Sequence, residues 1–220
     1  MAQREALSQV RISVRNLVEF VMRSGDLDDR RMAGAKKEAM QAGSRLHRKI
    51  QRRMGSDYQA EVSLKHTVKE DSFELLIEGR ADGIITEPGG VTIDEIKCIY
   101  MDPGRLEEPD PVHMAQALCY GTIYAVHHDL EEIGIQLTYC NIETEEIRRF
   151  KEVKTREELE DWFKGLIHEY VKWARYLYHH RMRRQECLKT LQFPYAYREG
   201  QKELAACVYR SVAEGRNLYI

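Results

Sequence analysis

A predicted β-hairpin constrains the fold of this 220-residue chain more than any other feature. The runs Phe73–Ile85 and Val91–Cys98 are rich in strand-forming residues, and the Glu-Pro-Gly-Gly segment Glu87–Gly90 between them is typical of a turn. A further run, Glu61–Val68, alternates apolar and polar residues just before this hairpin. We therefore predict three consecutive strands in the middle of the chain.

Segments with helical or strand periodicity flank these strands. Thr155 and Glu158 form a capping-box pattern, which predicts the start of a long helix. The order of elements is helices, three strands, helix, two strands, helix, and it indicates an α/β fold with a five-stranded sheet. The other helices are expected over Ile12–Met22, Gly43–Met54 and Val112–His127, the long one from Thr155 to about Arg184, and the last two strands over Ile135–Ile142 and Ile147–Val153.

Charge is segregated along the chain although the net charge is only −2. Residues 1–57 carry a net +6, residues 58–161 a net −14 and residues 162–220 a net +6. An acidic middle flanked by basic ends suits a carboxylate metal site that a polyanion approaches. The alternative is that helices with solvated basic faces merely flank an acidic sheet.

The predicted strand Val91–Cys98 carries two charged residues on one face. Period-two alternation puts Glu95 and Lys97 together and Asp94 on the opposite face. A carboxylate there can hold Mg²⁺ while the ammonium steadies a hydroxide or a phosphate. A surface strand with an ordinary Glu–Lys pair is the alternative.

Three further positions can complete a site around Glu95. Asp82 lies 13 residues earlier across the hairpin, so both carboxylates can reach one cation, although an Asp near a turn can also bond local backbone N–H groups. His47 on the preceding helix offers an imidazole suited to Mn²⁺, or is a solvated helix histidine. Gln116 and Tyr120 are four apart on a helix and can contact a phosphate or a base, or are ordinary amphipathic residues.

Helix His, strand Asp, strand Glu-x-Lys and helix Gln-x₃-Tyr occur here in one order. In this combination the chain resembles the PD-(D/E)xK nuclease superfamily over roughly residues 10–180, specifically its RecB-like branch, which includes the CRISPR-associated adaptation exonucleases and the AddAB nucleases. The resemblance implies a restriction-endonuclease-like core with a central mixed five-stranded sheet and a Mg²⁺- or Mn²⁺-dependent DNase, with exonuclease action on single strands preferred. It implies that the metal ligands are His47, Asp82, Glu95 and the Ile96 backbone carbonyl. The implied catalytic residues are Asp82, Glu95 and Lys97, and the implied nucleic-acid contacts are Gln116 and Tyr120.

The cysteines do not follow the pattern of several relatives, which bracket the core with four cysteines that hold an iron–sulfur cluster. The five cysteines here are widely spaced, contain no C-x₂-C pair, and include only Cys187 just after the core. We therefore expect no iron–sulfur cluster in this chain.

A second resemblance lies at the C-terminus. Leu191–Gln201 is similar to the glutamine motif of XPD- and DinG-type helicases, which implies that Gln201 reads adenine in a longer helicase chain. A helix over Lys202–Glu214 and a strand from Asn217 would then follow. No phosphate-loop motif occurs, so the chain alone is not expected to hydrolyse ATP. A C-terminal helical hairpin is the alternative.

The sequence thus predicts a nuclease domain over residues 1–185 and, over residues 186–220, a linker with the possible start of a truncated helicase domain. We expect a DNase that acts with a helicase in DNA repair or recombination. A non-catalytic module that clamps DNA for a helicase is the alternative, and a restriction-like or RNA-directed enzyme is a third possibility. No apolar run approaches the roughly 20 residues of a membrane helix and no signal peptide is evident, so cytoplasmic residence without membrane attachment is expected.

Overall fold

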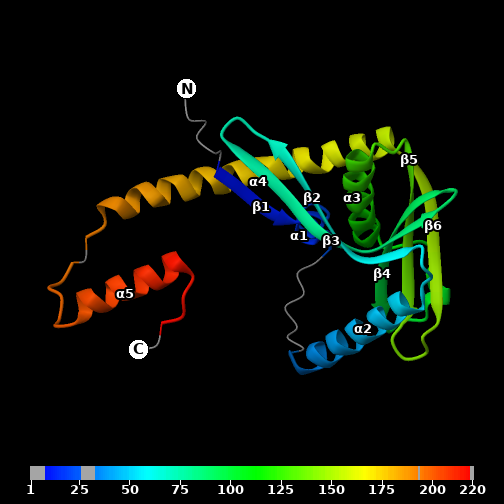
Figure 1. Cartoon of the computed structure of the whole chain (residues 1–220), viewed down its shortest axis with the longest axis horizontal. Helices are drawn as coiled ribbons and strands as arrows, with labels where there is room; N and C mark the ends of the chain where they lie inside the picture. Colours follow the sequence, from blue (N-terminus) through cyan, green and yellow to red (C-terminus); the bar gives the residue numbers. More distant parts are fainter. Residues whose placement is uncertain (1–7, 26–32, 193, 219–220) are drawn as a thin grey trace. The chain divides into compact units, whose positions relative to one another are not determined.

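The computed structural model describes residues 8–25, 33–192 and 194–218 (Figure 1). These residues form two compact units, one up to Tyr178 and the other from His179. The first unit contains the sheet and most of the helices, and the second contains the end of a long helix and one shorter helix.

The first unit is built on a six-stranded mixed sheet. β1 pairs with β3 and β4 with β5 in parallel, whereas the other pairs are antiparallel. This confirms the predicted α/β class and the mixed sheet flanked by helices, consistent with a restriction-endonuclease-like core, but with six strands in place of five. The strands are β1 Ser8–Ser13, β2 Tyr58–Lys69, β3 Phe73–Glu87, β4 Gly90–Ile99, β5 Glu132–Asn141 and β6 Ile147–Thr155.

The additional strand, β1, includes the first two residues of a predicted helix, and most of the rest of that helix is formed as α1. A helix was expected over Ile12–Met22, but Ile12 pairs with Ile77 of β3, and helix α1 begins only after Ser13. The Ser13 hydroxyl accepts a hydrogen bond from the Asn16 backbone N–H at 3.1 Å, which caps the helix. The spacing of apolar residues does not distinguish a strand from a helix at Ile12 and Ser13, and pairing with β3 makes these two residues part of a strand.

Strand β3 shares one of its edges between two other strands. β2 pairs along β3 from Lys69↔Glu74 to Tyr58↔Ile85 and so takes one whole edge. On the other edge, β1 pairs with residues 73–78 and β4 with residues 83–87. Residues 79–82 of β3 therefore have no ladder partner on that edge, and this opening holds the candidate site.

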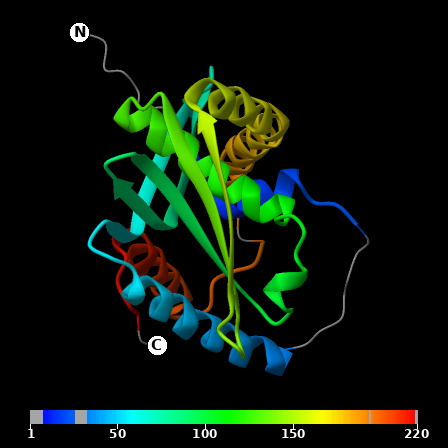
Figure 2. The ribbon, with the colours of Figure 1, turned by 90° about the vertical axis from the view of Figure 1, so that its right-hand side faces the viewer.

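Helices cover both faces of the sheet (Figure 1). The larger core joins α1, α3 and α4 to one face, and α2 packs Leu46 and Ile50 against Ile96 and Cys140 on the other. Lys49 of α2 pairs with Glu145 in the β5–β6 turn, which Figure 2 shows meeting this helix. The helices are α1 Val14–Val21, α2 Ala33–Arg53, the short η1 Pro103–Arg105, α3 Pro111–His128, α4 Arg156–Thr190 and α5 Gln201–Glu214.

The predicted capping box begins α4 as expected. The Thr155 backbone N–H donates to Glu158 Oε2 at 2.9 Å, and the Glu158 N–H donates to Thr155 Oγ1 at 3.2 Å. In the second unit, α5 matches the predicted C-terminal helix. The strand predicted from Asn217 is not formed at residues 217 and 218, and residues 219–220 lie outside the described part. None of the described helices is both long and apolar enough to cross a membrane.

Candidate metal centre and active site

Asp82 occupies the opening between β3 and β4. The last β3–β4 ladder pair is Gly83↔Asp94, and beyond it the Ile96 backbone N–H donates to Asp82 Oδ2 at 2.8 Å. The carboxylate therefore bridges the two strands where their ladder ends. This position, rather than a local turn, satisfies the Asp82 side chain.

His47 reaches Asp82 from α2. Its Nε2 lies 3.0 Å from Asp82 Oδ2, and its side chain is 18% exposed. Burial by itself lowers the pKa of His47, but the hydrogen bond and charge of Asp82, together with the charges of Glu61 and Glu95, raise it above 6.5. The structure thus brings the predicted His47 and Asp82 together.

Glu95 and Lys97 form the predicted pair on the α3 face of β4. Lys97 Nζ lies 2.9 Å from Glu95 Oε1 and 2.5 Å from Gln116 Oε1, so the ammonium is held between a strand and a helix. Asp94 points to the other face, where Gln136 and Thr138 donate to its Oδ1. Gln116 is 5% exposed and bonds the lysine.

The buried Glu95 carboxyl group is the most electrostatically perturbed group of the site. It is 6% exposed, and its Oε2 has no hydrogen-bond partner among the described residues. Burial and the negative charge of Asp82 raise the pKa of Glu95 to about 7, although Lys97 and His47 act in the opposite direction. An unpartnered carboxylate oxygen beside a second carboxylate is the environment that a cation would relieve.

The side chains around this opening fit a divalent cation. Ligand atoms of His47, Glu61 and Asp82 all lie within 4.8 Å of one another. Two ligands at right angles on an ion with bonds of about 2.1 Å would be about 3 Å apart, close to the observed separation of His47 Nε2 and Asp82 Oδ2. Oxygen donors with one imidazole suit Mn²⁺ well and Mg²⁺ adequately. The Ile96 carbonyl stays a predicted ligand.

Glu61 was not predicted as part of the site. It is the first residue of the predicted strand Glu61–Val68, and nothing in its local sequence distinguishes it. Counting the β2–β3 register, with Ala60 opposite Gly83 and Val62 opposite Ala81, places Glu61 across from Asp82. This register is known only from the structure, so the sequence alone did not identify Glu61 as part of the site.

Two glycines of β3 make room for tyrosines on either side of Asp82. A Cβ on Gly79 would lie 2.7 Å from the Tyr120 hydroxyl oxygen, and one on Gly83 would lie 2.0 Å from the Tyr58 ring. Tyr120 is 6% exposed, and burial followed by the charges of Glu95 and Asp82 raises its pKa. Tyr120 therefore packs on the strand that carries Asp82.

A basic hollow lies on α2, the helix that carries His47. It has a volume of about 520 Å³. Glu145 pairs with two of its side chains, those of Lys49 and Arg53. The hollow is lined by Arg45, Arg48, Lys49, Arg52 and Arg53.

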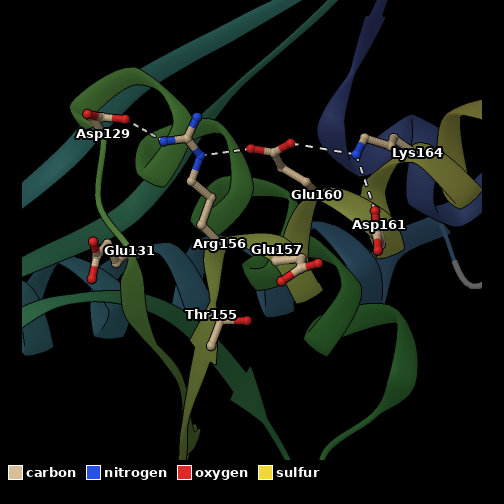
Figure 3. A pocket seen from close by; sticks show the side chains of 8 residues that line it. All are labelled: Asp129, Glu131, Thr155, Arg156, Glu157, Glu160, Asp161 and Lys164. Carbon is tan, nitrogen blue, oxygen red and sulfur yellow. Dashed lines mark hydrogen bonds and ion pairs between the residues drawn. The ribbon is translucent and has the colours of Figure 1, made fainter.

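Another hollow, of about 560 Å³, lies between the start of β5 and the start of α4 (Figure 3). Figure 3 shows Arg156 between Asp129 and Glu160, and it forms ion pairs with both. Lys164 pairs with Glu160 and Asp161 in the same way. Five acidic and two basic side chains line this hollow, and no residue of the candidate site is among them.

Gln201 and Cys187 lie in the second unit. Gln201 begins α5, and its Oε1 accepts from the Arg198 backbone N–H at 3.1 Å. Cys187 is exposed on α4, and no disulfide involves it. The adenine contact of Gln201 stays a prediction.

Comparisons with known proteins give distant structural likenesses. The chain is similar to SSO0001 at 19% identity, covering 76% of this chain and 78% of that one, with a TM-score of 0.45. It is similar to the alkaline exonuclease LHK-Exo from Laribacter hongkongensis in complex with dAMP at 14% identity, covering 80% and 94%, with a TM-score of 0.48. It is also similar to a phage-related exonuclease from Haemophilus somnus 129PT at 15% identity, covering 76% and 82%, with a TM-score of 0.38.

No family model matches the sequence, and no curated protein matches it. The structural likenesses are too distant to assign an activity, so the functional argument rests on the geometry of the site.

Proposed function

We propose that this chain is a divalent-metal-dependent deoxyribonuclease that hydrolyses DNA phosphodiester bonds. The observation that carries the proposal is the buried Glu95 carboxylate, whose Oε1 pairs with Lys97 while its Oε2 has no partner among the described residues. Buried polar atoms are nearly always hydrogen-bonded, so a buried carboxylate oxygen without a partner is a candidate ligand atom. A carboxylate that binds a cation has such an atom.

In this proposal Asp82 and Glu95 hold the metal ion, with His47 as a further ligand and the Ile96 carbonyl completing the set. When bound, the ion supplies positive charge that polarises the scissile phosphate and makes a water molecule easier to deprotonate. The short contact between His47 Nε2 and Asp82 Oδ2 supports a shared ligand position for these two groups.

Lys97 is the proposed catalytic lysine. Glu95 and Gln116 hold its ammonium from two sides, which fixes its position. From there it orients the attacking water and offsets the negative charge that develops on the phosphate in the transition state. The main proposed role of Gln116 is therefore to align Lys97. We also propose that Gln116 and Tyr120 contact a phosphate or a base.

DNA is the proposed substrate, and the basic hollow on α2 is the surface that supports it. Five Arg and Lys side chains line the hollow on the same helix as His47, and they can bind a phosphate backbone. Single-strand exonuclease action follows from the RecB-like resemblance. Degradation of linear but not circular single-stranded DNA tests it, and cleavage of the circle would contradict it.

The wider setting is part of the same proposal. The resemblance of the C-terminal residues to the glutamine motif supports a helicase partner, in cis or in trans, with Gln201 at an adenine site of a longer chain. This division assigns residues 1–185 to the nuclease and residues 186–220 to a linker. The setting is cytoplasmic DNA repair or recombination.

The test is release of nucleotides from labelled DNA with Mg²⁺, with Mn²⁺ and with a chelator. We expect metal-dependent release that Lys97→Ala lowers by about 100-fold or more, while the exposed control Lys65→Ala leaves it unchanged. Equal activity of Lys97→Ala and wild type would remove Lys97 from the mechanism. DNA binding without any release would favour a non-catalytic clamping module.

A further inference from the structure

Glu61 has a backbone conformation that its residue type rarely adopts. Its φ is +59°, in the left-handed region, although it lies within strand β2. The register places it across from Asp82, between the pairs Ala60↔Gly83 and Val62↔Ala81. Glutamate gains nothing intrinsic from this conformation, because glycine and asparagine tolerate it better. Such strain in a strand beside a candidate site indicates that the side chain is needed there.

Three side chains surround the Glu61 carboxylate. Gln51 Nε2 donates to Glu61 Oε1 at 3.1 Å, and the same amide nitrogen lies 2.9 Å from the Asp82 backbone carbonyl oxygen. Arg80 Nε lies 2.5 Å from Glu61 Oε2. Oε1 also lies 3.8 Å from His47 Nδ1. The carboxylate is thus fixed by Gln51 and Arg80 in a position that faces the imidazole.

His47 lies between two carboxylates, one on each ring nitrogen. Nε2 faces Asp82 at 3.0 Å and Nδ1 faces Glu61 at 3.8 Å. A histidine that binds a metal through one nitrogen commonly directs the N–H of the other toward a carboxylate, which fixes the tautomer and the ring orientation. The order Glu61, His47, Asp82 matches this arrangement, with Glu61 in electrostatic contact at 3.8 Å, a separation longer than a hydrogen bond.

We propose that Glu61 is a positioning residue that keeps the His47 proton on Nδ1 and leaves the Nε2 lone pair free for a divalent cation shared with Asp82. This inference rests on the proposed function, because it assigns a role to the same metal centre. Glu61 acts through His47, and the left-handed backbone is the conformation that aims its carboxylate at the ring.

The inference separates metal binding from stability. If Glu61 mainly supported the fold, removing its side chain would lower the stability of the protein. If it positions His47, Glu61→Gly weakens metal binding, while the urea midpoint of the metal-free protein is unchanged or higher because glycine relieves the left-handed strain. Glu61→Asn, which also tolerates this conformation, is the second variant.

Glu145 provides a matched control. It is also a glutamate with a positive φ, +60°, and it also pairs with basic side chains, those of Lys49 and Arg53. Glu145→Gly therefore relieves the same strain and removes similar ion pairs away from His47. Asp82→Asn is the reference variant that removes a proposed ligand.

The experiment is a titration of each variant with Mn²⁺ by calorimetry, together with urea unfolding in the presence of a chelator. We expect Glu61→Gly and Glu61→Asn to weaken Mn²⁺ binding about 10-fold or more, and Glu145→Gly to leave it unchanged. Because Glu61 acts through His47, the double variant Glu61→Gly/His47→Ala binds Mn²⁺ no more weakly than His47→Ala alone.

Three results would overturn the inference without affecting the proposed function. The first is that both Glu61 variants bind Mn²⁺ as tightly as wild type while Asp82→Asn loses binding. The second is that the losses of Mn²⁺ affinity from Glu61→Gly and His47→Ala add in the double variant. The third is that both Glu61 variants have a lower urea midpoint than wild type. Failure of the proposed function looks different. In that case wild type does not bind Mn²⁺, or Asp82→Asn binds it as tightly as wild type.

Discussion

The buried Glu95 carboxyl group makes the stability of the metal-free protein depend on pH. Burial and the charge of Asp82 raise its pKa from about 4.5 to about 7. The folded protein therefore holds this proton more tightly than the unfolded chain does. The stabilisation is complete below the unfolded pKa and is lost as the pH rises through the folded one. We predict falling stability between pH 5 and pH 8, and the perturbation that isolates the cause is Glu95→Gln.

The magnitude follows from the size of the shift. Each pKa unit corresponds to about 1.4 kcal/mol, so loss of this proton costs the metal-free protein at most roughly 3 to 4 kcal/mol of unfolding free energy. Solvent screens this charge only weakly, because Glu95 is 6% exposed. Glutamine resembles the protonated carboxyl group and does not titrate, so the variant lacks this contribution.

Urea unfolding with a chelator, followed by tryptophan fluorescence, measures the effect. Trp162 and Trp173 both lie on α4 within the first unit, so the signal reports on the unit that contains Glu95. The pKa values of His47 and Asp94 are also raised and give the same sign, but they are present in both proteins. If the unfolding free energies of wild type and Glu95→Gln change with pH in parallel, the reasoning is refuted. Mn²⁺ must displace the proton, so it should stabilise wild type more at pH 8 than at pH 5.5.

Three further predictions concern packing and substrate binding. Gly83→Ala lowers the unfolding free energy by about 1–3 kcal/mol, because its Cβ would lie 2.0 Å from the Tyr58 ring, and an unchanged urea midpoint would contradict this. Gly165→Ala raises the unfolding free energy by about 0.5–1 kcal/mol in the same assay, because a Cβ at this position within α4 meets no atom within 4 Å and alanine favours the helix. A lower unfolding free energy would show that the space around Gly165 is not open. Replacing Arg48 and Arg52 by Gln makes the plot of log K against log salt concentration for single-stranded DNA binding less steep, by about 0.7 per lost phosphate contact. Fluorescence anisotropy measures this slope, and an unaltered slope would exclude the basic hollow as a contact surface.

Local pattern was sufficient to predict the two strands that carry the site. Alternation along Val91–Cys98 placed Glu95 with Lys97 and apart from Asp94, and the structure has this arrangement because neighbouring side chains of a strand point to opposite faces. The capping box at Thr155 was also predictable, since its hydrogen bonds join residues three apart.

Features that depend on distant parts of the chain were not predictable in this way. Ile12 belongs to β1 because β3 offers it a parallel partner, which the apolar spacing alone does not reveal. Helix α2 begins at Ala33 rather than Gly43, because its first ten residues lack the apolar stripe by which the helix was identified. Glu61 reaches the site through the β2–β3 register and a left-handed backbone, neither of which has a signature in its own segment.

The central claim is that Asp82 and Glu95 bind one divalent ion with His47 beside them. Anomalous scattering from a crystal soaked in Mn²⁺ tests it most directly. The account predicts a manganese peak about 2 Å from a carboxylate oxygen of each acid, with the Glu95 ligand being the oxygen that has no partner in the present structure. A fully soaked crystal with manganese bound elsewhere, or with none between these two carboxylates, would contradict it.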